Sequence, residues 1–365
     1  MKKISQIVTA ALFFVFVAGF GLLHLLLPDR NFSPTENRTL AELPVFSWEA
    51  LVDGSYTADL EEYLADQFPL RDDWMGLKAK YEYLLGKREF HDVFLAGDVL
   101  ISDITDTSRA DQNLGYIQNL LEKTDKPVYL GLIPTAAEIW KGQLPYDAPT
   151  FDQLSYLEQA KNLGAIWVDM AGVLSEHSDE QIYYRTDHHW TSLGAYYGYA
   201  AFLEAAGLEI PELGEGVTVS DTFCGTLYST SGVHWLEPDT IEHYVSGEGV
   251  SVENGLTGEI GGLYVESKLE EKDKYSHFLG GNNPLYIVRN PNATIDKKLL
   301  VVRDSYSDSL APFLSQTYSE IHLIDLRYYR TSVAAYAEMA GMDEIFICYS
   351  VENFVKDIDA VFIGK

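Results

Sequence analysis

The chain has 365 residues, of which 47% are hydrophobic and 22% charged, with 24 Tyr, 17 Phe and 6 Trp. This composition supplies a large apolar core and excludes global disorder. The formal net charge of −29 argues against a nucleic-acid binder, which needs a basic surface to neutralise phosphates.

The N-terminus predicts a membrane-spanning helix. Lys2 and Lys3 precede an almost uninterrupted apolar run, Ile7 to Leu27. At about 1.5 Å per residue, that run crosses a hydrocarbon core about 30 Å thick. The lysines favour a cytoplasmic N-terminus. We therefore expect a signal anchor over residues 1–28, with one pass through the cell membrane and an extracytoplasmic remainder; a cleaved signal, which releases a secreted protein, is the alternative.

Residues 29–90 are predicted to form an extended strap and then a helical entry to the main domain. Amphipathic patterns at Ala58–Phe68 and Trp74–Leu85 favour two helices there. The main domain is expected over residues 91–365.

The first part of the main domain alternates strands and helices. Residues 93–101 predict a hairpin, and Ser108–Glu122 predicts a helix with Ser108 as its N-cap. The continuous apolar run Val128–Ile133 is typical of a strand covered on both faces, and residues 165–169 predict another strand. A helix is expected at Ser192–Ala206, with Leu193, Tyr196, Tyr197, Ala200 and Leu203 on its inner face.

Residues 211–283 differ, because glycine is frequent and no long helical pattern occurs. Short strands and turns are expected there, as a β-rich insertion that borders the functional site.

Regular alternation then resumes. Four apolar runs predict buried strands at residues 285–288, 299–302, 321–325 and 345–348, and helical stretches separate the last three. This βαβαβ order predicts an α/β fold with a parallel sheet and helices on both faces. Ligands bind such sheets at the carboxyl ends of the strands, where Ser305, Arg327 and Asn353 are expected.

Two motifs carry the residue types of nucleophilic catalysis. A serine hydroxyl needs a neighbouring base and a group that orients this base. In an extended segment the side chains i and i+2 point the same way, so Asp187 would orient His189, the base, while His188 would point away. The alternative, which this geometry favours less, is that Asp187 pairs with His188 as adjacent loop residues. Ser305 follows a predicted strand and opens a predicted helix, which is a typical position for an exposed nucleophile.

The helix that follows Ser305 also suits an oxyanion, because its first N–H groups have no acceptor within the helix. We expect the Ser305 turn and the Asn353 side chain to stabilise this oxyanion. Asn290 is the second candidate for the side-chain donor. Arg327, Tyr328 and Trp190 are candidates for binding a sugar, and His188 for a further substrate contact. Trp190 is equally compatible with a core position behind the histidine.

Each motif also has a simpler interpretation. An isolated Asp-His-His is compatible with a structural role or a metal site, and Asp304-Ser305 with an ordinary helix cap. Their joint occurrence favours catalysis, because each motif supplies what the other lacks. The two cysteines, Cys224 and Cys348, lack the spacing of a metal site, and we expect neither a metal nor a cofactor.

The stretch Thr186-Asp187-His188-His189-Trp190 resembles the signature of the DHHW proteins, relatives of the SGNH-like alginate and cell-wall O-acetyltransferases. The resemblance includes the turn Asp304–Ser307, Glu36-Asn37-Arg38, Asp66-x-Phe68-Pro69-x-Arg71 and the segment Asp325–Tyr329. It implies an SGNH-hydrolase-like, or flavodoxin-like, sheet with a permuted motif order, in which the Asp–His pair precedes the serine. The relatives often carry a small polar residue at the position of His188.

The resemblance implies serine-dependent acyl transfer to a polysaccharide, or ester hydrolysis on one, through Ser305, His189 and Asp187. It also implies a membrane-bound O-acyltransferase as acyl donor and a carbohydrate polymer as acceptor. Two other hypotheses are a non-catalytic scaffold in the cell envelope and a metal-dependent phosphoesterase. The second needs upstream Asp clusters that the sequence lacks.

Overall fold

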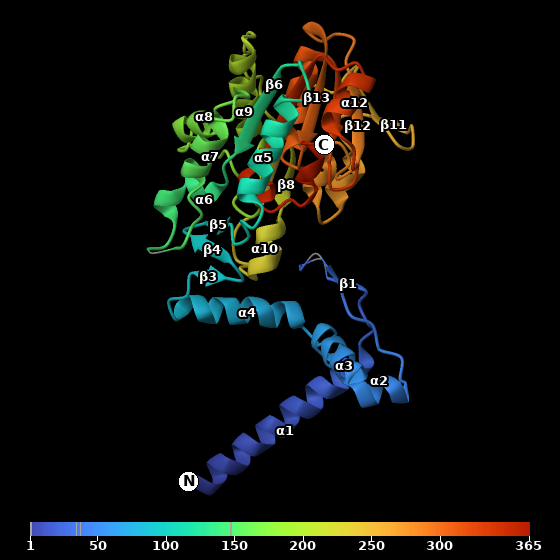
Figure 1. Cartoon of the computed structure of the whole chain (residues 1–365). Coiled ribbons are helices and arrows are strands. Elements are labelled where there is room, and N and C mark those ends of the chain that lie inside the picture. Colours follow the sequence, from blue (N-terminus) through green and yellow to red (C-terminus); the bar gives the residue numbers. More distant parts are fainter. Residues whose placement is uncertain (1, 34, 37, 147) are drawn as a thin grey trace. The chain divides into compact units, whose positions relative to one another are not determined.

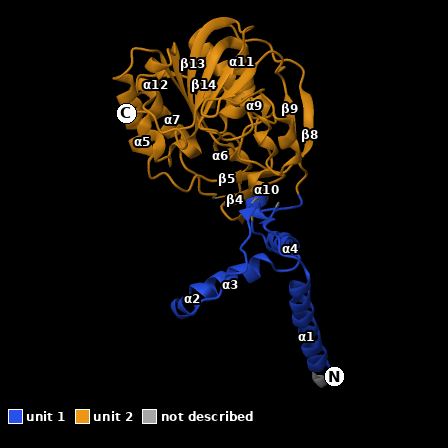
Figure 2. Ribbon diagram, turned by 90° about the vertical axis from the view of Figure 1, so that its right-hand side faces the viewer, with its two compact units in different colours: residues 1–87, 229–235 blue, residues 88–228, 236–365 orange. Residues whose placement is uncertain are grey.

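The computed structural model describes residues 2–33, 35–36, 38–146 and 148–365. The chain divides into two compact units (Figure 2). The smaller unit comprises residues 1–87 and 229–235, and the larger unit comprises residues 88–228 and 236–365.

The smaller unit is mainly helical. Its elements are α1 (Lys2–Leu26), β1 (Phe32–Ser33), β2 (Arg38–Thr39), α2 (Trp48–Asp53), α3 (Ser55–Asp66) and α4 (Arg71–Leu84). Within α1, Ile4–Leu26 is long and apolar enough to cross a membrane, and none of its most apolar stretch is buried.

An ion network in the smaller unit joins the strap to the corner between α3 and α4. The Arg38 guanidinium donates to both oxygens of Asp66, at 2.8 and 2.5 Å, and to Glu36 at 2.8 Å. Arg71 also contacts Glu36. These residues belong to the motifs at Glu36-Asn37-Arg38 and Asp66–Arg71, so the motifs have a structural role here. Asn37, from the same stretch, lies outside the described residues.

The larger unit is built around an eight-stranded sheet with the order β11-β10-β12-β14-β13-β15-β6-β7. Figure 1 labels β6, β11, β12 and β13 of this sheet. The neighbours from β14 to β7 run parallel, whereas β12, β10 and β11 join by antiparallel pairing. The prediction of a parallel α/β sheet of SGNH-hydrolase-like type is confirmed. The antiparallel direction of β12 was not predicted, because a buried apolar run carries no information on strand direction.

The bounds of the elements in the larger unit follow. The strands of the sheet are β6 (Val128–Ile133), β7 (Ile166–Trp167), β10 (Ser251–Asn254), β11 (Ile260–Gly261), β12 (Leu285–Arg289), β13 (Ile295–Arg303), β14 (Tyr318–Ile324) and β15 (Glu344–Ser350). Outside it lie the three-stranded sheet β3 (Glu89–Phe90), β4 (Val93–Ala96) and β5 (Val99–Ser102) and the pair β8 (Val217–Phe223) and β9 (Asp239–His243). The helices are α5 (Ala110–Leu121), α6 (Ala136–Ile139), α7 (Gln153–Lys161), α8 (Met170–Glu176), α9 (Ser192–Ala206), α11 (Ser307–Thr317), α12 (Val333–Met339) and α13 (Val351–Phe354). The residues of α10 (Thr226–Ser231) are divided between the two units. Four short 3₁₀ helices are η1 (Lys141–Gln143), η2 (Glu266–Glu270), η3 (Lys274–His277) and η4 (Asp359–Phe362).

Helices cover both faces of the sheet. Successive side chains of a strand point to opposite faces. In β13, Leu299 and Val301 belong to the apolar cluster that includes α8, α9 and α11, and Leu300 and Val302 to the one that includes α5, α7 and α12. Burial on both faces explains the continuous apolar run in the sequence.

Helix α9 has the predicted bounds, and its predicted inner face is met in part. It begins after Thr191, whose side chain accepts from Gly194 N at 3.2 Å, and ends at Gly207 with a left-handed φ of 67°. Its fully buried face carries Ala195, Tyr199, Phe202 and Leu203. Of the residues predicted to face inward, Leu203 is fully buried, and Leu193, Tyr196 and Tyr197 are partly buried and pack against the core. The periodicity gave little contrast, because nearly the whole helix is apolar.

The predicted N-cap of α5 is also wrong. Arg109 holds that position, and α5 begins at Ala110.

Candidate active site

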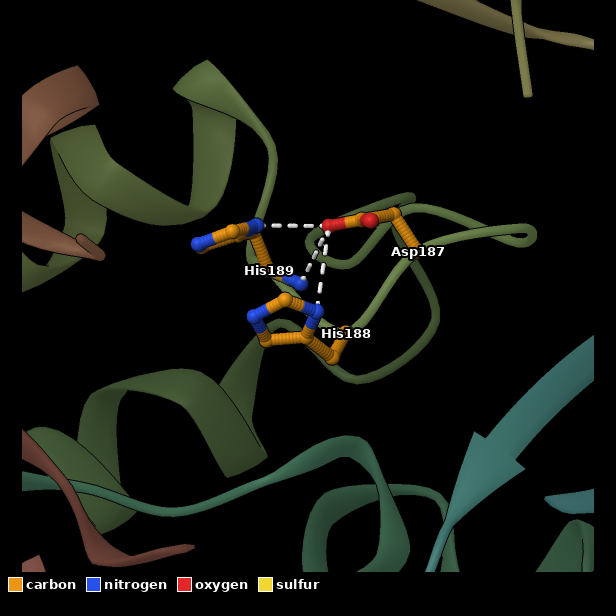
Figure 3. A group of neighbouring side chains, drawn as sticks. All are labelled: Asp187, His188 and His189. Atoms are coloured by element: carbon orange, nitrogen blue, oxygen red, sulfur yellow. Dashed lines mark hydrogen bonds and ion pairs between the residues drawn. The ribbon is translucent and has the colours of Figure 1, made fainter. Parts of the chain in front are cut away.

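Asp187 and His189 lie in a tight hairpin rather than in an extended segment. Tyr183 pairs with Trp190, and Tyr184 N donates to His189 O at 3.1 Å. The chain between these pairs bends sharply, so the side chains do not alternate. The prediction that His188 points away is therefore wrong: its ring lies 3.9 Å from the His189 ring, and its Nδ1 is 3.6 Å from Asp187 Oδ1 (Figure 3).

The Asp187 carboxylate is buried and fully hydrogen-bonded. Its Oδ1 accepts from His189 N at 3.0 Å and from His189 Nδ1 at 2.6 Å, and its Oδ2 accepts from Thr226 N at 2.7 Å and Thr226 Oγ1 at 2.9 Å. Burial alone would raise the pKa of Asp187, but the neighbouring histidines and these hydrogen bonds outweigh it, and the pKa lies well below its ordinary value. Asp187 is thus a carboxylate.

Besides Thr226, Asp239 and Gly225 of the segment 211–283 also contact the hairpin loop. Asp239, in β9, accepts from Arg185 N at 2.9 Å, Thr186 N at 2.8 Å and Thr186 Oγ1 at 2.6 Å. Gly225 approaches Asp187 so closely that an added Cβ would lie 2.2 Å from Asp187 Cβ. Sequence reasoning missed both, since no motif marks a residue that is brought to the loop by a distant strand or turn.

Ser305 lies in the turn between β13 and α11. The turn is pinned by Asp304, whose Oδ2 accepts from Ser350 N at 2.9 Å, Ser350 Oγ at 2.7 Å and Asn353 Nδ2 at 2.9 Å. Its Oδ1 accepts from Tyr306 N at 3.1 Å. Asp304 and Tyr306 are 0% exposed, whereas Ser305 between them is half-buried, so the serine is the residue that the turn presents outward.

The hairpin and the turn meet at the His189 ring. His189 Nε2 lies 2.7 Å from Ser305 Oγ, and Nδ1 lies 2.6 Å from Asp187 Oδ1. Burial alone would lower the pKa of His189, but the charge and hydrogen bond of Asp187 outweigh it and the pKa is raised. The bond to the carboxylate requires the proton on Nδ1, a tautomer assigned from the hydrogen-bond network, which leaves the Nε2 lone pair for the serine hydroxyl.

Tyr275, in η3, covers the histidine. Its ring stacks on the His189 ring with centroids 3.9 Å apart and an interplanar angle of 12°. Its hydroxyl donates to Ser305 O at 3.0 Å and bonds Ser309 Oγ at 3.0 Å. One side chain therefore touches both halves of the site. Among 24 tyrosines in the sequence, nothing distinguished this one.

A buried ion pair lies under the serine turn. Arg303 Nη1 is 2.6 Å from Asp308 Oδ1, and the two side chains are 0% and 3% exposed. Burial raises the pKa of Asp308 to about 7, although Arg303 and His189 favour its charged form.

The predicted sugar-binding residues have other partners. Trp190 is 0% exposed and donates from Nε1 to Tyr306 O at 2.9 Å and Ser309 Oγ at 3.0 Å. It is a core residue behind the site, so the prediction that it contacts sugar is wrong. Arg327 binds Asp325 through two nitrogens, at 2.9 and 2.6 Å, and its guanidinium lies 5.5 Å from the centre of the Tyr328 ring. Tyr328 is 55% exposed, and the described residues show no contact between this pair and Ser305 or His189.

The predicted oxyanion side chains are engaged elsewhere. Asn353 Nδ2 donates to Asp304, so this amide supports the serine turn from behind. Asn290 donates to Ser315 O at 2.8 Å, near the far end of α11, and the prediction that it serves Ser305 in reserve is wrong. The Ser305 amide N–H donates to no protein acceptor within the described residues.

The group Asp187, His188 and His189 has donor atoms within 4.8 Å of one another and is the candidate metal-binding cluster of the described residues. The donor set fits a metal poorly. Both Asp187 oxygens already accept two hydrogen bonds each, and His189 Nδ1 carries the proton bound to Asp187. A metal ligand needs these lone pairs free.

The fold and the site together define an α/β protein with a hydrogen-bonded Asp–His–Ser chain at the carboxyl edge of a parallel sheet. The model of the DHHW protein family matches residues 36–126 and 152–324, more than half of the chain. The chain belongs to the DHHW family.

Solved structures share this fold. A DHHW family protein from Eubacterium siraeum is 24% identical, with a TM-score of 0.63, over 74% of this chain and 93% of that chain. Bacillus cereus PatB1 with a sulfonyl adduct is 16% identical, with a TM-score of 0.61, over 74% of this chain and 97% of that chain. The O-acetyltransferase domain of Pseudomonas putida AlgJ is 15% identical over 73% of this chain and 94% of that chain, and its TM-score of 0.44 is too low to support a conclusion. A search of curated proteins found no match.

Proposed function

We propose that this protein transfers an acyl group to a hydroxyl of an extracytoplasmic carbohydrate, or hydrolyses such an ester, through Ser305, His189 and Asp187. The observation that carries the proposal is the continuous hydrogen-bond chain from Asp187 Oδ1 through His189 to Ser305 Oγ, at 2.6 and 2.7 Å. These distances lie within reach for proton transfer between a nucleophile, its base and an orienting group.

In the first half-reaction, Ser305 Oγ attacks the acyl carbonyl carbon while its proton moves to His189 Nε2. Asp187 stabilises the imidazolium that results. The tetrahedral intermediate collapses as the alcohol of the donor ester leaves with the proton from Nε2, and the acyl group remains on Ser305. In the second half, a sugar hydroxyl or water attacks the carbonyl carbon of the acyl-enzyme while its proton moves to Nε2. This second tetrahedral intermediate collapses as Ser305 Oγ leaves and takes the proton from Nε2, which restores the serine and releases the acylated sugar or the free acid.

The Ser305 backbone N–H is the proposed first donor to the oxyanion, since it has no protein acceptor among the described residues. It lies just before α11, and a helix N-terminus favours developing negative charge. Asn353 would act through Asp304, by holding the turn, rather than by touching the oxyanion.

The proposed location rests on α1, and the proposed substrates rest on the family resemblance. We assign α1 to a signal anchor and residues 29–90 to the connecting segment, so that the catalytic domain at 91–365, with its insertion at about 211–283, works outside the cytoplasm. A carbohydrate polymer is the proposed acceptor, with Arg327, Tyr328 and His188 as candidate contacts. A membrane-bound O-acyltransferase is the proposed source of the acyl group.

A test compares wild type, Ser305→Ala and His189→Ala as purified full-length chains, with Ser319→Ala as a matched control remote from the site. PatB1 carries a sulfonyl adduct, so an aryl sulfonyl fluoride is a suitable probe. We expect wild type and Ser319→Ala to be sulfonylated at Ser305, detected by peptide mass spectrometry, and to turn over an aryl acetate. Ser305→Ala and His189→Ala should each lose about 10³-fold or more of the turnover.

Wild-type protein that folds but shows neither labelling of Ser305 nor turnover would contradict the proposal and favour a scaffold. Turnover that survives Ser305→Ala but disappears with a chelator would instead favour metal chemistry at Asp187, His188 and His189.

A further inference from the structure

Helix α4 in the smaller unit has one face that packs inside that unit. Ala79 is its buried residue. On the same side, the Tyr83 ring lies against Trp235, with centroids 5.7 Å apart. Segment 229–235 thus covers this face of α4.

A second, apolar face of α4 is exposed. Trp74, Leu77, Tyr81, Leu84 and Leu85 are 39%, 58%, 62%, 75% and 70% exposed. Their spacing of three, four, three and one residues places them in one stripe along the helix. A contiguous exposed apolar surface of this kind marks a binding surface in most proteins.

The neighbours of the stripe identify the kind of partner. Lys78 and Lys80 are exposed on its two flanks, and the exposed Asp73 lies beside Lys80 in the first turn. An apolar face with Trp, Tyr and Leu between lysines is typical of a helix that lies in a membrane interface, where the rings sit at headgroup level and the lysines reach the phosphates.

The stripe is continuous with the apolar surface of α1. The Trp74 ring lies 6.3 Å from the Phe16 ring and 5.8 Å from the Phe20 ring, and Phe68 stacks on Phe20 at 5.4 Å. At about 1.5 Å per residue, Phe20 lies about 9 Å below Leu26, the last residue of the apolar stretch. If α1 spans a bilayer, Trp74 is held at or below the level where the headgroups meet the acyl chains.

We propose that α4 lies on the outer leaflet of the membrane that α1 spans, with the stripe from Trp74 to Leu85 in contact with phospholipid. The inference rests on the proposed anchoring by α1, and not on the chemistry of Ser305.

The test uses the full chain in lipid nanodiscs of phosphatidylcholine and phosphatidylglycerol. In a Cys224→Ser background, in which the other native cysteine, Cys348, is buried, cysteines are introduced and spin-labelled one at a time at Leu77, Tyr81 or Leu84. Lys80→Cys and Glu82→Cys are controls on the two sides of α4 outside the stripe. A cysteine at Val15 reports whether α1 is in the bilayer. We expect the ratio of oxygen to nickel-chelate accessibility to be several-fold higher at the three stripe positions than at Lys80 and Glu82, and high at Val15.

Stripe labels that are as accessible to nickel chelate as Lys80, while Val15 is in lipid, would overturn the proposal and point to a protein that covers the stripe. A Val15 label in water would overturn both the anchoring and the lipid contact. Sulfonylation of Ser305 in the same discs reports separately on the proposed chemistry, so the two failures are distinguishable.

A second variant tests the stripe without labelling it directly. Leu77→Glu/Leu84→Glu should lower the accessibility ratio at a Tyr81 label several-fold, because two carboxylates would have to leave water. The matched control, Leu256→Glu/Met339→Glu, replaces two exposed apolar residues of the larger unit and should leave the Tyr81 ratio unchanged. An equal ratio in both variants would contradict the lipid contact.

Discussion

Ser305 lies at the end of a central strand in a regular parallel sheet, whereas His189 lies in a loop that is held by side chains from an irregular segment. The serine turn is fixed by its sheet neighbours, since Asp304 bonds the end of β15 at Ser350. The histidine loop depends instead on Asp239, Thr226 and Tyr275, all from residues 211–283. Regular strands thus fix the serine, and long-range polar contacts fix the histidine.

The serine half of the site (the turn Asp304–Ser307) and the histidine half (the hairpin Tyr183–Trp190) should respond differently to substitution. Substitutions beneath the serine turn should lower the stability of the whole sheet, because the turn is continuous with β13 and α11. Substitutions that remove the contacts of the hairpin loop should lower turnover more than they lower stability. The following variants test this difference.

The largest loss of stability is expected for Asp308→Asn. It removes the carboxylate from the fully buried pair with Arg303, 2.6 Å away, and leaves the guanidinium without its counter-charge. Breaking such a pair typically costs about 3–5 kcal/mol of unfolding free energy, to be measured by urea denaturation of the full chain at about pH 8.5, above the Asp308 pKa of about 7. The double variant Arg303→Met/Asp308→Leu should recover most of this loss, because it removes both charges. A single variant within about 1 kcal/mol of wild type would show that the pair contributes little to the serine half.

The sequence predicted the serine half well for a physical reason. A continuous apolar run followed by Asp-Ser and a helical pattern describes a buried strand, a turn and a helix, and these are determined by nearby residues. The pairing of Asp187 with His189 was also predicted, but through an extended geometry that the structure does not have. The hairpin loop, residues 185–188, brings His188 to the same side of the chain as Asp187 and His189. The periodicity of the sequence cannot predict such a bend.

The supports of the histidine half could not be predicted. Asp239 is 53 residues from Thr186 along the chain, and Tyr275 bonds a residue 30 positions away. Neither has a local pattern that separates it from other acidic or aromatic residues. The burial of Trp190 was likewise undecidable, because a tryptophan next to a catalytic motif is compatible with a binding surface and with a core. Only packing against Tyr306 and Gly198 decides it.

A smaller loss of stability but a clear loss of activity is expected for Asp239→Ala. The substitution leaves the amides of Arg185 and Thr186 without their acceptor, which typically costs about 1–3 kcal/mol. The loop should shift and move His189 relative to Ser305, and a displacement of about 1 Å can lower the rate about 100-fold. Turnover of an aryl acetate and urea denaturation would be compared with Thr240→Ala, an exposed position on the same strand. If the loss of turnover were no larger than the fraction of unfolded protein explains, the loop would not depend on Asp239 for its geometry.

The smallest effect concerns pH and the segment that carries Tyr275. His243 Nε2 bonds His277 Nε2 at 2.7 Å, with the Tyr264 ring stacked on His243 and Glu266 3.9 Å from His277. Burial, and then the charge of His277, lower the pKa of His243 from 6.5 to about 4. The folded protein therefore binds fewer protons than the unfolded chain between these two values, so its stability falls as pH drops through this window.

The variant His243→Gln keeps a donor to His277 but cannot titrate. Between about pH 6.5 and 5, wild type should lose about 1 kcal/mol relative to the variant, a value reduced from about 2 because the half-buried ring is screened by water. Urea denaturation at the two pH values measures this difference, with His177→Gln as a control at a partly exposed histidine that pairs with Glu180 instead of another histidine. If His243→Gln and wild type showed equal pH dependence, the His243–His277 pair would not be a source of acid sensitivity in the segment that carries Tyr275.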